Sequence, residues 1–420
     1  MFYQQSELNN GLTVISERME GVRSVCLGIW FKVGSRDESD PQQGISHFME
    51  HMMFKGTQKR DAFAISQEFE TLGAEQNAFT SKEYTCYFSR FVDDKLPEII
   101  EILGDMVTGS VFDQEAINSE REVVIEEIAR SEDTPDDYIF ELFTRAVFPT
   151  HPLGRPIIGT RDVVGAFVHD DCIGYQNAHY HAGNCVVVAA GNVDHAQLVA
   201  LCEEHLAKMP TGTRNTRDVV LGQPFERFAL MKKDTEQAHI IYGMPGIPLG
   251  DDDRFANSLL DTALGGGMSS RLFQEVREKR GLAYAIYAST MSYLGGGQFL
   301  VYAGTRPSNI QEVVSIIKRE VDTLYKEGLS QEELDRVRQY VIGSIVLSSE
   351  STSQRMSRLG KCSVGELEML SLDEIIERYQ QVTLKDTMRV AQRILNQKPT
   401  VAVISPFETT EVKAQLSEVL

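Results

Sequence analysis

Residues 44–56 read GISHFMEHMMFKG, a strongly patterned stretch of the chain. Its apolar residues recur at i, i+3, i+4, i+7 and i+8, the spacing of one face of an α-helix. They are Ile45, Phe48, Met49, Met52 and Met53. At about 100° per residue, His47, Glu50 and His51 lie together on the opposite face. The segment predicts a helix that buries one side and presents two imidazoles and a carboxylate on the other.

The polar face of this predicted helix suits a metal ion. Two histidines four residues apart can direct their ring nitrogens at one ion from successive turns. A carboxylate one residue before the second histidine can sit beside a bound water without being a ligand. The order HxxEH is the inverted zinc-protease motif, in which an open ligand position holds the water. A five-residue pattern alone leaves the alternative of a solvated face that carries two histidines by chance.

A second helix is predicted for residues 115–130, EAINSEREVVIEEIAR. Its apolar side consists of Ile117, Val124 and Ile128. Glu120 and Glu127 flank that side, and Glu126 points to solvent. Half-buried carboxylates are costly unless they meet a cation or hydrogen-bond donors. The pattern therefore favours Glu127 or Glu120 as a third metal ligand, although without the histidines a charged surface helix would be the better interpretation.

The charge of the chain excludes one class of function. The 420 residues contain 41 Lys and Arg against 61 Asp and Glu, a formal net charge of −20. No basic surface is available to neutralise phosphates, which argues against nucleic acid as a partner. The length predicts two or three domains with cores of their own.

Cysteine usage and hydropathy predict a cytoplasmic protein that does not enter the membrane. The six cysteines are scattered without a CxxC pair, which fits a reducing compartment. The N-terminal residues are polar where a signal peptide would be apolar, and no stretch is long and apolar enough to suggest a membrane span.

The chain shows signs of an internal duplication. Residues 255–267, FANSLLDTALGGG, align with the HxxEH segment at an offset of 210. Residues 329–339 align with 112–122 at an offset of 217, and strand-like runs recur near 84–91 and 283–290. Several matches in the same order predict a repeated unit.

We expect an α+β fold with two homologous domains, each a mixed, largely antiparallel sheet backed by helices. A segment rich in Pro, Gly, Thr and Asn begins near residue 208 and predicts the joint. The expected boundaries are 1–208 for an N-terminal metal-binding domain, 209–222 for a linker, and 223–420 for a C-terminal domain.

The second repeat cannot build the same site. Asn257, Leu260, Asp261 and Ser344 replace the two histidines and two glutamates of the first repeat. Residues 269–289 predict a helix that buries Leu272, Phe273 and Val276, ends at Gly281, and leads into a strand.

HFMEHMMFKGT at 47–57, with a glutamate 76 residues after His51, resembles the pitrilysin/insulinase family of zinc metallopeptidases. The nearer match is to bacterial processing peptidases similar to the beta subunit of mitochondrial processing peptidase. The resemblance implies one zinc per chain, held by His47, His51 and Glu127. It further implies that Glu50 is the general base and that Glu120 supports the ligands without binding the metal.

Residues 72–88, LGAEQNAFTSKEYTCYF, resemble the edge strand along which this family binds its substrate. The resemblance implies that Asn77 and Ala78 pair with a peptide backbone by strand addition. Residues 151–159, HPLGRPIIG, and 191–194, GNVD, are similar to structural signatures of the family.

The family has an Arg and a Tyr that reach the substrate, matched here by Arg277 and Tyr284, and an apolar pocket residue matched by Phe273. Guanidinium and phenol donors suit a substrate carbonyl or an oxyanion. Alone, this unspecific spacing favours a capping arginine and a core tyrosine, and the metal-binding half of the chain reverses that preference.

The sequence thus predicts a zinc endopeptidase that cleaves extended peptides. In long family members four such units form a chamber, whereas this chain supplies two, so the resemblance implies a homodimer. The charge suggests an acidic chamber that prefers basic peptides. The alternatives are a noncatalytic peptide-binding or scaffold subunit and, less well supported by the edge strand, a metallohydrolase for small molecules.

Overall fold

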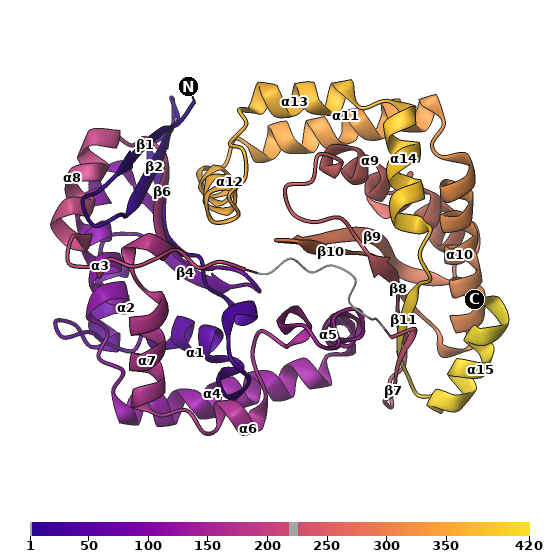
Figure 1. Cartoon of the computed structure of the whole chain (residues 1–420), viewed down its shortest axis with the longest axis horizontal. Helices are drawn as coiled ribbons and strands as arrows, with labels where there is room; N and C mark the ends of the chain where they lie inside the picture. The colour runs from indigo at the N-terminus through magenta and orange to yellow at the C-terminus, as the bar shows by residue number, and fades with distance from the viewer. Residues whose placement is uncertain (1, 218–225) are drawn as a thin grey trace. The chain divides into compact units, whose positions relative to one another are not determined.

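The computed structural model describes residues 2–217 and 226–420, which form two compact units (Figure 1). The first unit comprises residues 1–129, 155–216 and 348–371, and the second comprises 130–154, 217–347 and 372–420. Neither unit is a continuous half of the chain, which differs from the expected division at 208 and 223. Residues 218–222 of the expected linker lie outside the described residues.

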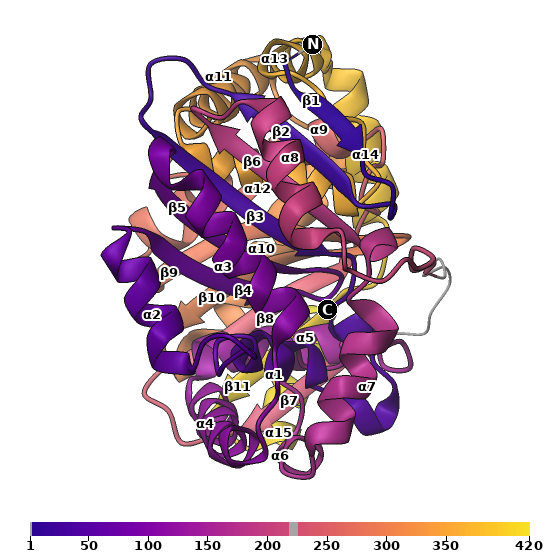
Figure 2. The ribbon, with the colours of Figure 1, turned by 90° about the vertical axis from the view of Figure 1, so that its left-hand side faces the viewer.

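The first unit contains a sheet of six strands in the order β1-β2-β6-β3-β5-β4, which Figure 2 shows face-on. The strands are β1 Gln4–Glu7, β2 Thr13–Arg18, β3 Ser24–Phe31, β4 Glu75–Thr80, β5 Thr85–Val92 and β6 Cys185–Gly191. Only β2 and β6 pair in parallel, and every other neighbouring pair is antiparallel. β4 therefore lies at an edge, paired with β5 alone.

The two faces of this sheet are covered by different helices. Alternate residues such as Leu27 and Ile29 pack into a core with α3 and α8, while their neighbours Cys26 and Trp30 pack against α12. The period of two follows from the pleat of a strand, and near-continuous burial follows from cover on both faces. The helices of this unit are α1 Ile45–Met52, α2 Ala62–Thr71, α3 Leu96–Gly109, α4 Gln114–Asp133, α6 Arg161–Val164, α7 His169–His179, α8 His195–Leu206 and α12 Thr352–Val364.

The second unit repeats this topology. Its sheet has the order β7-β11-β8-β10-β9, again with one parallel pair, β7 with β11. The strands are β7 Phe228–Lys232, β8 Ala238–Pro245, β9 Ala283–Tyr293, β10 Gly296–Thr305 and β11 Thr400–Ser405. The helices are α5 Pro135–Val147, α9 Arg254–Gly265, α10 Ile310–Glu327, α11 Gln331–Ser348, α13 Leu372–Gln381, α14 Leu384–Leu395 and α15 Thr409–Val419, with a π-helix at Phe273–Glu278. The predicted α+β fold with two homologous domains is confirmed.

The repeats exchange one helix. α5, from the first half of the sequence, packs on the second sheet, and α12, from the second half, packs on the first. Each is seated over a glycine of a central strand. A Cβ on Gly28 would lie 2.6 Å from Met356 Sδ, and a Cβ on Gly243 would lie 2.5 Å from Phe143 Cζ. This exchange explains why the units are discontinuous.

One detail of the expected duplication needs correction. The strand at 283–293 is β9, an edge strand, so its counterpart in the first unit is β4 and not the strand near 84–91. The counterpart of β5 is β10. The local pattern of alternation is the same in both strands of a hairpin, so periodicity could not assign the pairing partners.

All six cysteines are free thiols, and five of them are buried. Among the described residues, no helix is both long and apolar enough to cross a membrane.

Candidate metal centre

The helix α1 forms as the sequence predicts. Ile45, Phe48 and Met49 are fully buried, and Met52 is nearly so. His47, Glu50 and His51 are only partly buried on the opposite side. The helix has eight residues and is placed by this apolar contact with the core of the first unit.

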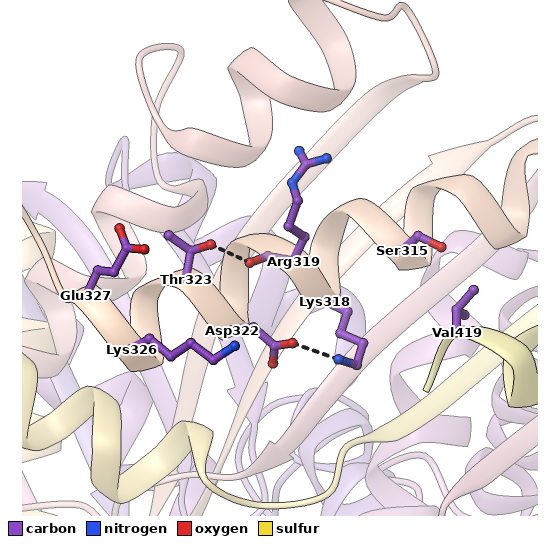
Figure 3. Close-up of a pocket in the computed structure, with 8 residues that line it drawn as sticks. All are labelled: Ser315, Lys318, Arg319, Asp322, Thr323, Lys326, Glu327 and Val419. Carbon is purple, nitrogen blue, oxygen red and sulfur yellow. Dashed lines mark hydrogen bonds and ion pairs between the residues drawn. The ribbon is translucent and has the colours of Figure 1, made fainter.

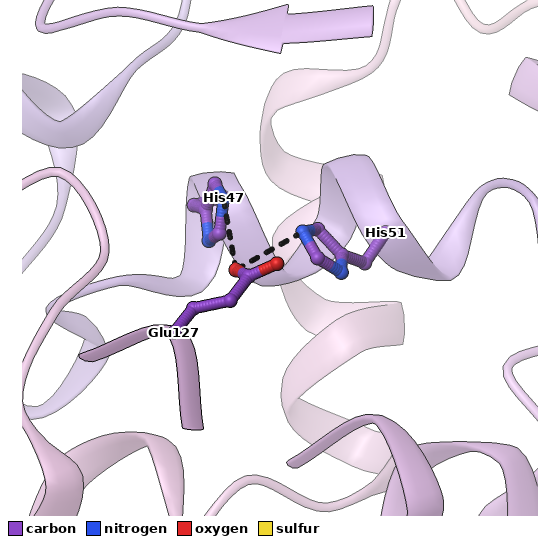
Figure 4. A group of neighbouring side chains, drawn as sticks. All are labelled: His47, His51 and Glu127. Carbon is purple, nitrogen blue, oxygen red and sulfur yellow. Dashed lines mark ion pairs between the residues drawn. The ribbon is translucent and has the colours of Figure 1, made fainter. Parts of the chain in front are cut away.

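The helix α4 brings a carboxylate to the two histidines (Figure 4). Glu127 Oε2 lies 3.8 Å from His47 Nε2 and 3.6 Å from His51 Nε2. On the same helix Glu120 is buried and Glu126 is exposed, as the helical pattern predicts. Among residues 2–217 and 226–420, these three form the only group of three or more His, Cys, Asp or Glu side chains whose ligand atoms lie within 4.8 Å of one another.

This donor set fits zinc. Ligand atoms about 2.0–2.1 Å from a tetrahedral zinc lie about 3.4 Å apart, slightly closer than the distances observed here. Two imidazole nitrogens and one carboxylate are the ligands of a catalytic zinc with one open position. His47, His51 and Glu127 would therefore hold the metal with only small side-chain movements.

Glu120 orients one of the ligands. Its Oε1 lies 2.8 Å from His51 Nδ1, and its Oε2 forms an ion pair with Lys55 Nζ at 2.6 Å. Because the carboxylate accepts a hydrogen bond from Nδ1–H, the lone pair of His51 Nε2 is left to bind a metal. The sequence implied this supporting position for Glu120 but missed Lys55, which follows His51 by four residues.

Glu50 occupies a different environment from Glu120. Its Oε2 accepts a 2.6 Å hydrogen bond from Thr80 Oγ1 on the edge strand β4. Burial raises the pKa of Glu50, and the hydrogen bond from Thr80 lowers it in part. Sequence reasoning missed Thr80. It lies two residues after Ala78, and the alternation of side chains along a strand places both on the same face.

The two histidines titrate differently. Burial lowers the pKa of His47 to about 4, and the nearby His51 adds to the effect. Burial also opposes charge on His51, but the Glu120 hydrogen bond and the charge of Glu127 outweigh it and raise the pKa. His47 is therefore neutral, the form a metal binds, at neutral pH.

A cavity of about 230 Å³ adjoins this centre in the first unit. It is lined by Glu50, His51, Phe54, Lys55, Asn77, Ala78 and Glu120. The structure thus brings the predicted residues Asn77 and Ala78 beside the predicted base. Asn77 Oδ1 accepts a 2.8 Å hydrogen bond from the backbone N–H of Ala78.

Phe273, Arg277 and Tyr284 form a cluster in the second unit. The Arg277 guanidinium lies 4.7 Å from the centre of the Phe273 ring and 4.6 Å from that of Tyr284. Arg277 Nη1 also donates to the Tyr284 carbonyl at 2.9 Å. Tyr284 is 79% exposed, which rules out a core tyrosine.

The predicted helix around this cluster forms, but as a π-helix at Phe273–Glu278. The helix ends at Glu278, three residues before the predicted Gly281, whose positive φ of 60° suits glycine and turns the chain toward β9. Leu272 and Val276 are fully buried as predicted, whereas Phe273 is only half-buried and lies against Arg277. π-Turns occur frequently at functional sites.

The counterpart of the metal centre in the second unit is closed. On α9, Asn257 is buried and Asp261 is half-buried with its Oδ1 atom covered. Asn257 Nδ2 donates to Thr290 Oγ1 at 3.0 Å. The Oδ1 atoms of Asn257 and Asp261 have no hydrogen-bond partner among the described residues. Burial raises the pKa of Asp261 to about 7, while a hydrogen bond with Thr290 lowers it in part.

A larger polar pocket, of about 420 Å³, lies on α10 of the second unit (Figure 3). Two of its lining residues, Lys318 and Asp322, form a 2.7 Å ion pair along the helix itself. It contains neither histidine nor cysteine, so its size does not indicate chemistry.

Comparisons with known proteins agree with the site and the fold. Residues 13–161 match the family model described as insulinase, peptidase family M16, and residues 166–341 match that of the M16 inactive domain. An uncharacterized zinc protease of Streptomyces coelicolor is 42% identical, over 96% of this chain and 90% of that protein. The uncharacterized zinc protease YmxG of Bacillus subtilis is 36% identical, over 94% of this chain and 97% of that protein.

Two solved structures share the fold. An M16 inactive domain from Pseudomonas fluorescens aligns with a TM-score of 0.91 at 21% identity, over 97% of this chain and 98% of that one. A protease from Helicobacter pylori aligns with a TM-score of 0.85 at 23% identity, over 96% and 98%.

An inverted HxxEH helix with a carboxylate beside it from a second helix, on a duplicated α+β fold, is the arrangement of the inverted-motif metallopeptidases. The chain belongs to the insulinase family of peptidases, family M16. The match of residues 166–341 to the inactive domain agrees with the loss of the ligand positions in the second unit.

Replacing Thr80 with Val is expected to move the acidic limb of the pH profile of peptide hydrolysis upward. Without the hydroxyl, the effect of burial is offset less, so the pKa of Glu50 rises further and less of its carboxylate is ionised at a given pH. The loss in kcat/KM on the acidic limb should be roughly tenfold, the size of a hydrogen bond to a charged group. Thr80→Ser keeps the hydroxyl and should keep the profile, whereas coincident profiles for Val and the parent would contradict this role.

Asp261 should make the protein less stable as the pH rises. Its folded pKa of about 7 lies above the ordinary value of 3.8, so its contribution is complete below about pH 4 and is lost as the pH passes about 7. Asp261→Asn has nearly the same shape and no charge. Melting temperatures measured at several pH values should therefore fall less steeply in this variant. Parallel curves for the two proteins would refute the buried-acid explanation.

Proposed function

We propose that this protein is a zinc-dependent endopeptidase that cleaves extended or unstructured peptides. The observation that carries the proposal is the convergence of His47, His51 and Glu127 beside the carboxylate of Glu50, which lines a cavity next to an edge strand. One zinc per chain would occupy this centre. Bound zinc supplies an acidified water and polarises the scissile carbonyl.

The residues of the chain then divide the chemistry among them. Glu50 takes a proton from the attacking water and later delivers it to the leaving amine, so it returns to its starting state. A raised pKa suits this exchange, because the group must both accept and release a proton near neutral pH. Glu120 keeps His51 oriented while the proton moves through Glu50.

The substrate would bind as an added strand. β4 pairs only with β5, so its other edge can accept the backbone of an extended peptide. Asn77 and Ala78 lie at that edge beside Glu50, and the apolar side of the cavity at Phe54 can receive a side chain. Strand addition requires an unfolded segment, which makes unstructured peptides the substrate class.

Arg277 and Tyr284 would contact the substrate carbonyl or the oxyanion that forms during attack. Both project from the second unit, with Tyr284 largely exposed and the guanidinium held between two rings. We propose that two chains form a homodimeric chamber in which these residues of one chain serve the zinc centre of the other. A processing-peptidase specificity, a preference for basic peptides and a cytoplasmic location complete the proposal.

The noncatalytic alternative is less well supported. A scaffold subunit has no need of ligands or a base, yet all four positions are present in the first unit with suitable geometry. The inactive-domain match covers residues 166–341, which lie outside the centre formed by α1 and α4.

Glu50→Gln is expected to abolish turnover of a fluorogenic peptide while leaving the zinc content unchanged. The amide keeps the shape and the Thr80 contact but cannot take a proton from water. We expect a loss of at least about a thousandfold in kcat. Zinc is measured by elemental analysis of the same samples. Cleavage at the parental rate would exclude the mechanism, and a parent that contains no zinc and cleaves nothing would favour the scaffold.

The homodimer can be tested by mixing inactive variants. Glu50→Gln and Arg277→Ala chains should each be inactive alone. If each site combines two chains, a mixed dimer contains one intact site, so mixing should restore up to about a quarter of the parental activity. If both residues act within one chain, no activity returns. Sedimentation measures the dimer content of each sample.

A further inference from the structure

The two metal-binding histidines are held in different ways. His51 is fixed through its side chain, because Nδ1 bonds to Glu120. His47 Nδ1 is buried and has no hydrogen-bond partner among the described residues. The direction of the His47 ring must therefore be set by the backbone that carries it, the first turn of α1.

That first turn has no cap of its own. The residue at its start is Gly44, with a φ of 93°, and no side chain of the helix bonds to its free N–H groups. The cap comes instead from Glu38, six residues earlier. Glu38 Oε2 accepts from the Gly44 N–H at 2.8 Å, and Oε1 accepts from the Ser46 N–H at 2.8 Å. One carboxylate thus fixes both the start of the helix and the residue directly before His47.

Glu38 is itself anchored by the segment 151–159. Arg155 Nη1 donates to the Glu38 carbonyl at 2.5 Å and Nη2 donates to Asp40 at 2.5 Å. Gly159 packs directly on the helix start, since a Cβ on Gly44 would lie 2.7 Å from Gly159 Cα. The HPLGRPIIG segment, which the proposed chemistry leaves unused, therefore closes around the residues that hold α1.

The position of Glu38 is costly. The side chain is 4% exposed, and burial raises its pKa to about 7 despite the hydrogen bonds from Ser46 and Gly44 and the charge of Lys82. A buried carboxylate without a cation in contact would be disfavoured unless its hydrogen bonds were required. The hydroxyl of Tyr175 forms a 2.6 Å hydrogen bond with Ser46 Oγ and so also holds the first turn of α1.

We propose that Glu38 is a positioning residue of the metal centre, which orients His47 by holding the backbone of the first turn of α1. The Arg155 segment acts through Glu38. The inference rests on the proposed zinc centre and extends it, because it assigns to His47 the support that Glu120 gives to His51.

The test is zinc affinity, measured by competition with a chelator and therefore independent of catalysis. Glu38→Gln retains one acceptor oxygen but replaces the other with a donor, so one of the two backbone bonds is lost. We expect the zinc dissociation constant to rise about tenfold, as for other residues that support metal ligands. kcat should fall while KM stays near the parental value, because β4 is not touched.

Glu17→Gln provides a matched control. Glu17 is a buried carboxylate of the same unit, 2% exposed and bound by Arg355 and Arg358 of α12. Its replacement should lower the melting temperature without changing zinc affinity. An unchanged zinc affinity in Glu38→Gln, or an equal loss in Glu17→Gln, would overturn the proposal. A parent protein without zinc would instead refute the proposed function, and this inference with it.

A second variant covers the case in which Glu38→Gln does not fold. Arg155→Gln leaves the Glu38 side chain in place but removes both anchors of its loop. It should weaken zinc binding in the same direction by a smaller factor, about threefold. A folded Arg155→Gln protein with parental zinc affinity would then count against Glu38 as a positioning residue.

Discussion

The site depends on the burial of one face of a helix that is too short to be stable alone. Isolated helices need about 12–15 residues in water, and α1 has eight. Phe48, Met49 and Met52 supply the missing stability by packing into the first core. Because those residues fix the rotation of the helix, they also fix the direction of the polar face. The chemistry of His47 and His51 is therefore set by apolar residues that never touch a metal.

On the polar side of this helix, the surroundings shift the pKa values of two glutamates, Glu120 and Glu50, in opposite directions. Burial opposes the charge of Glu120, but bonds from His51 and Lys55 outweigh it and lower its pKa. Burial raises the pKa of Glu50, which has Thr80 as its hydrogen-bond donor. Two carboxylates whose pKa values are shifted in opposite directions are suited to separate tasks. One can stay charged, and the other can exchange a proton.

The sequence predicted what local periodicity determines. The buried face of α1 and the inward placement of Glu120 follow from the period of 3.6, whereas the edge strand at Asn77 was implied by the family resemblance. The exchange of α5 and α12 could not be predicted, because an amphipathic helix specifies that it needs an apolar partner but not which sheet supplies it. The strand period places Thr80 on the same face as Ala78, but its contact with Glu50, like that of Lys55 with Glu120, joins separate elements and required the structure.

The exchange also explains why one unit could lose the metal centre while the fold persisted. Each sheet needs a helix from the other half of the sequence, since without α12 Trp30 and Ile15 lose their cover, and without α5 Ile241 and Leu300 lose theirs. Loss of either exchanged helix would therefore expose apolar residues of a sheet, and this cost does not depend on the polar residues of α9. The apolar cluster that α5 forms with the second sheet contains no residue of α9, so the polar residues of α9 can differ from those of α1 without removing this cover.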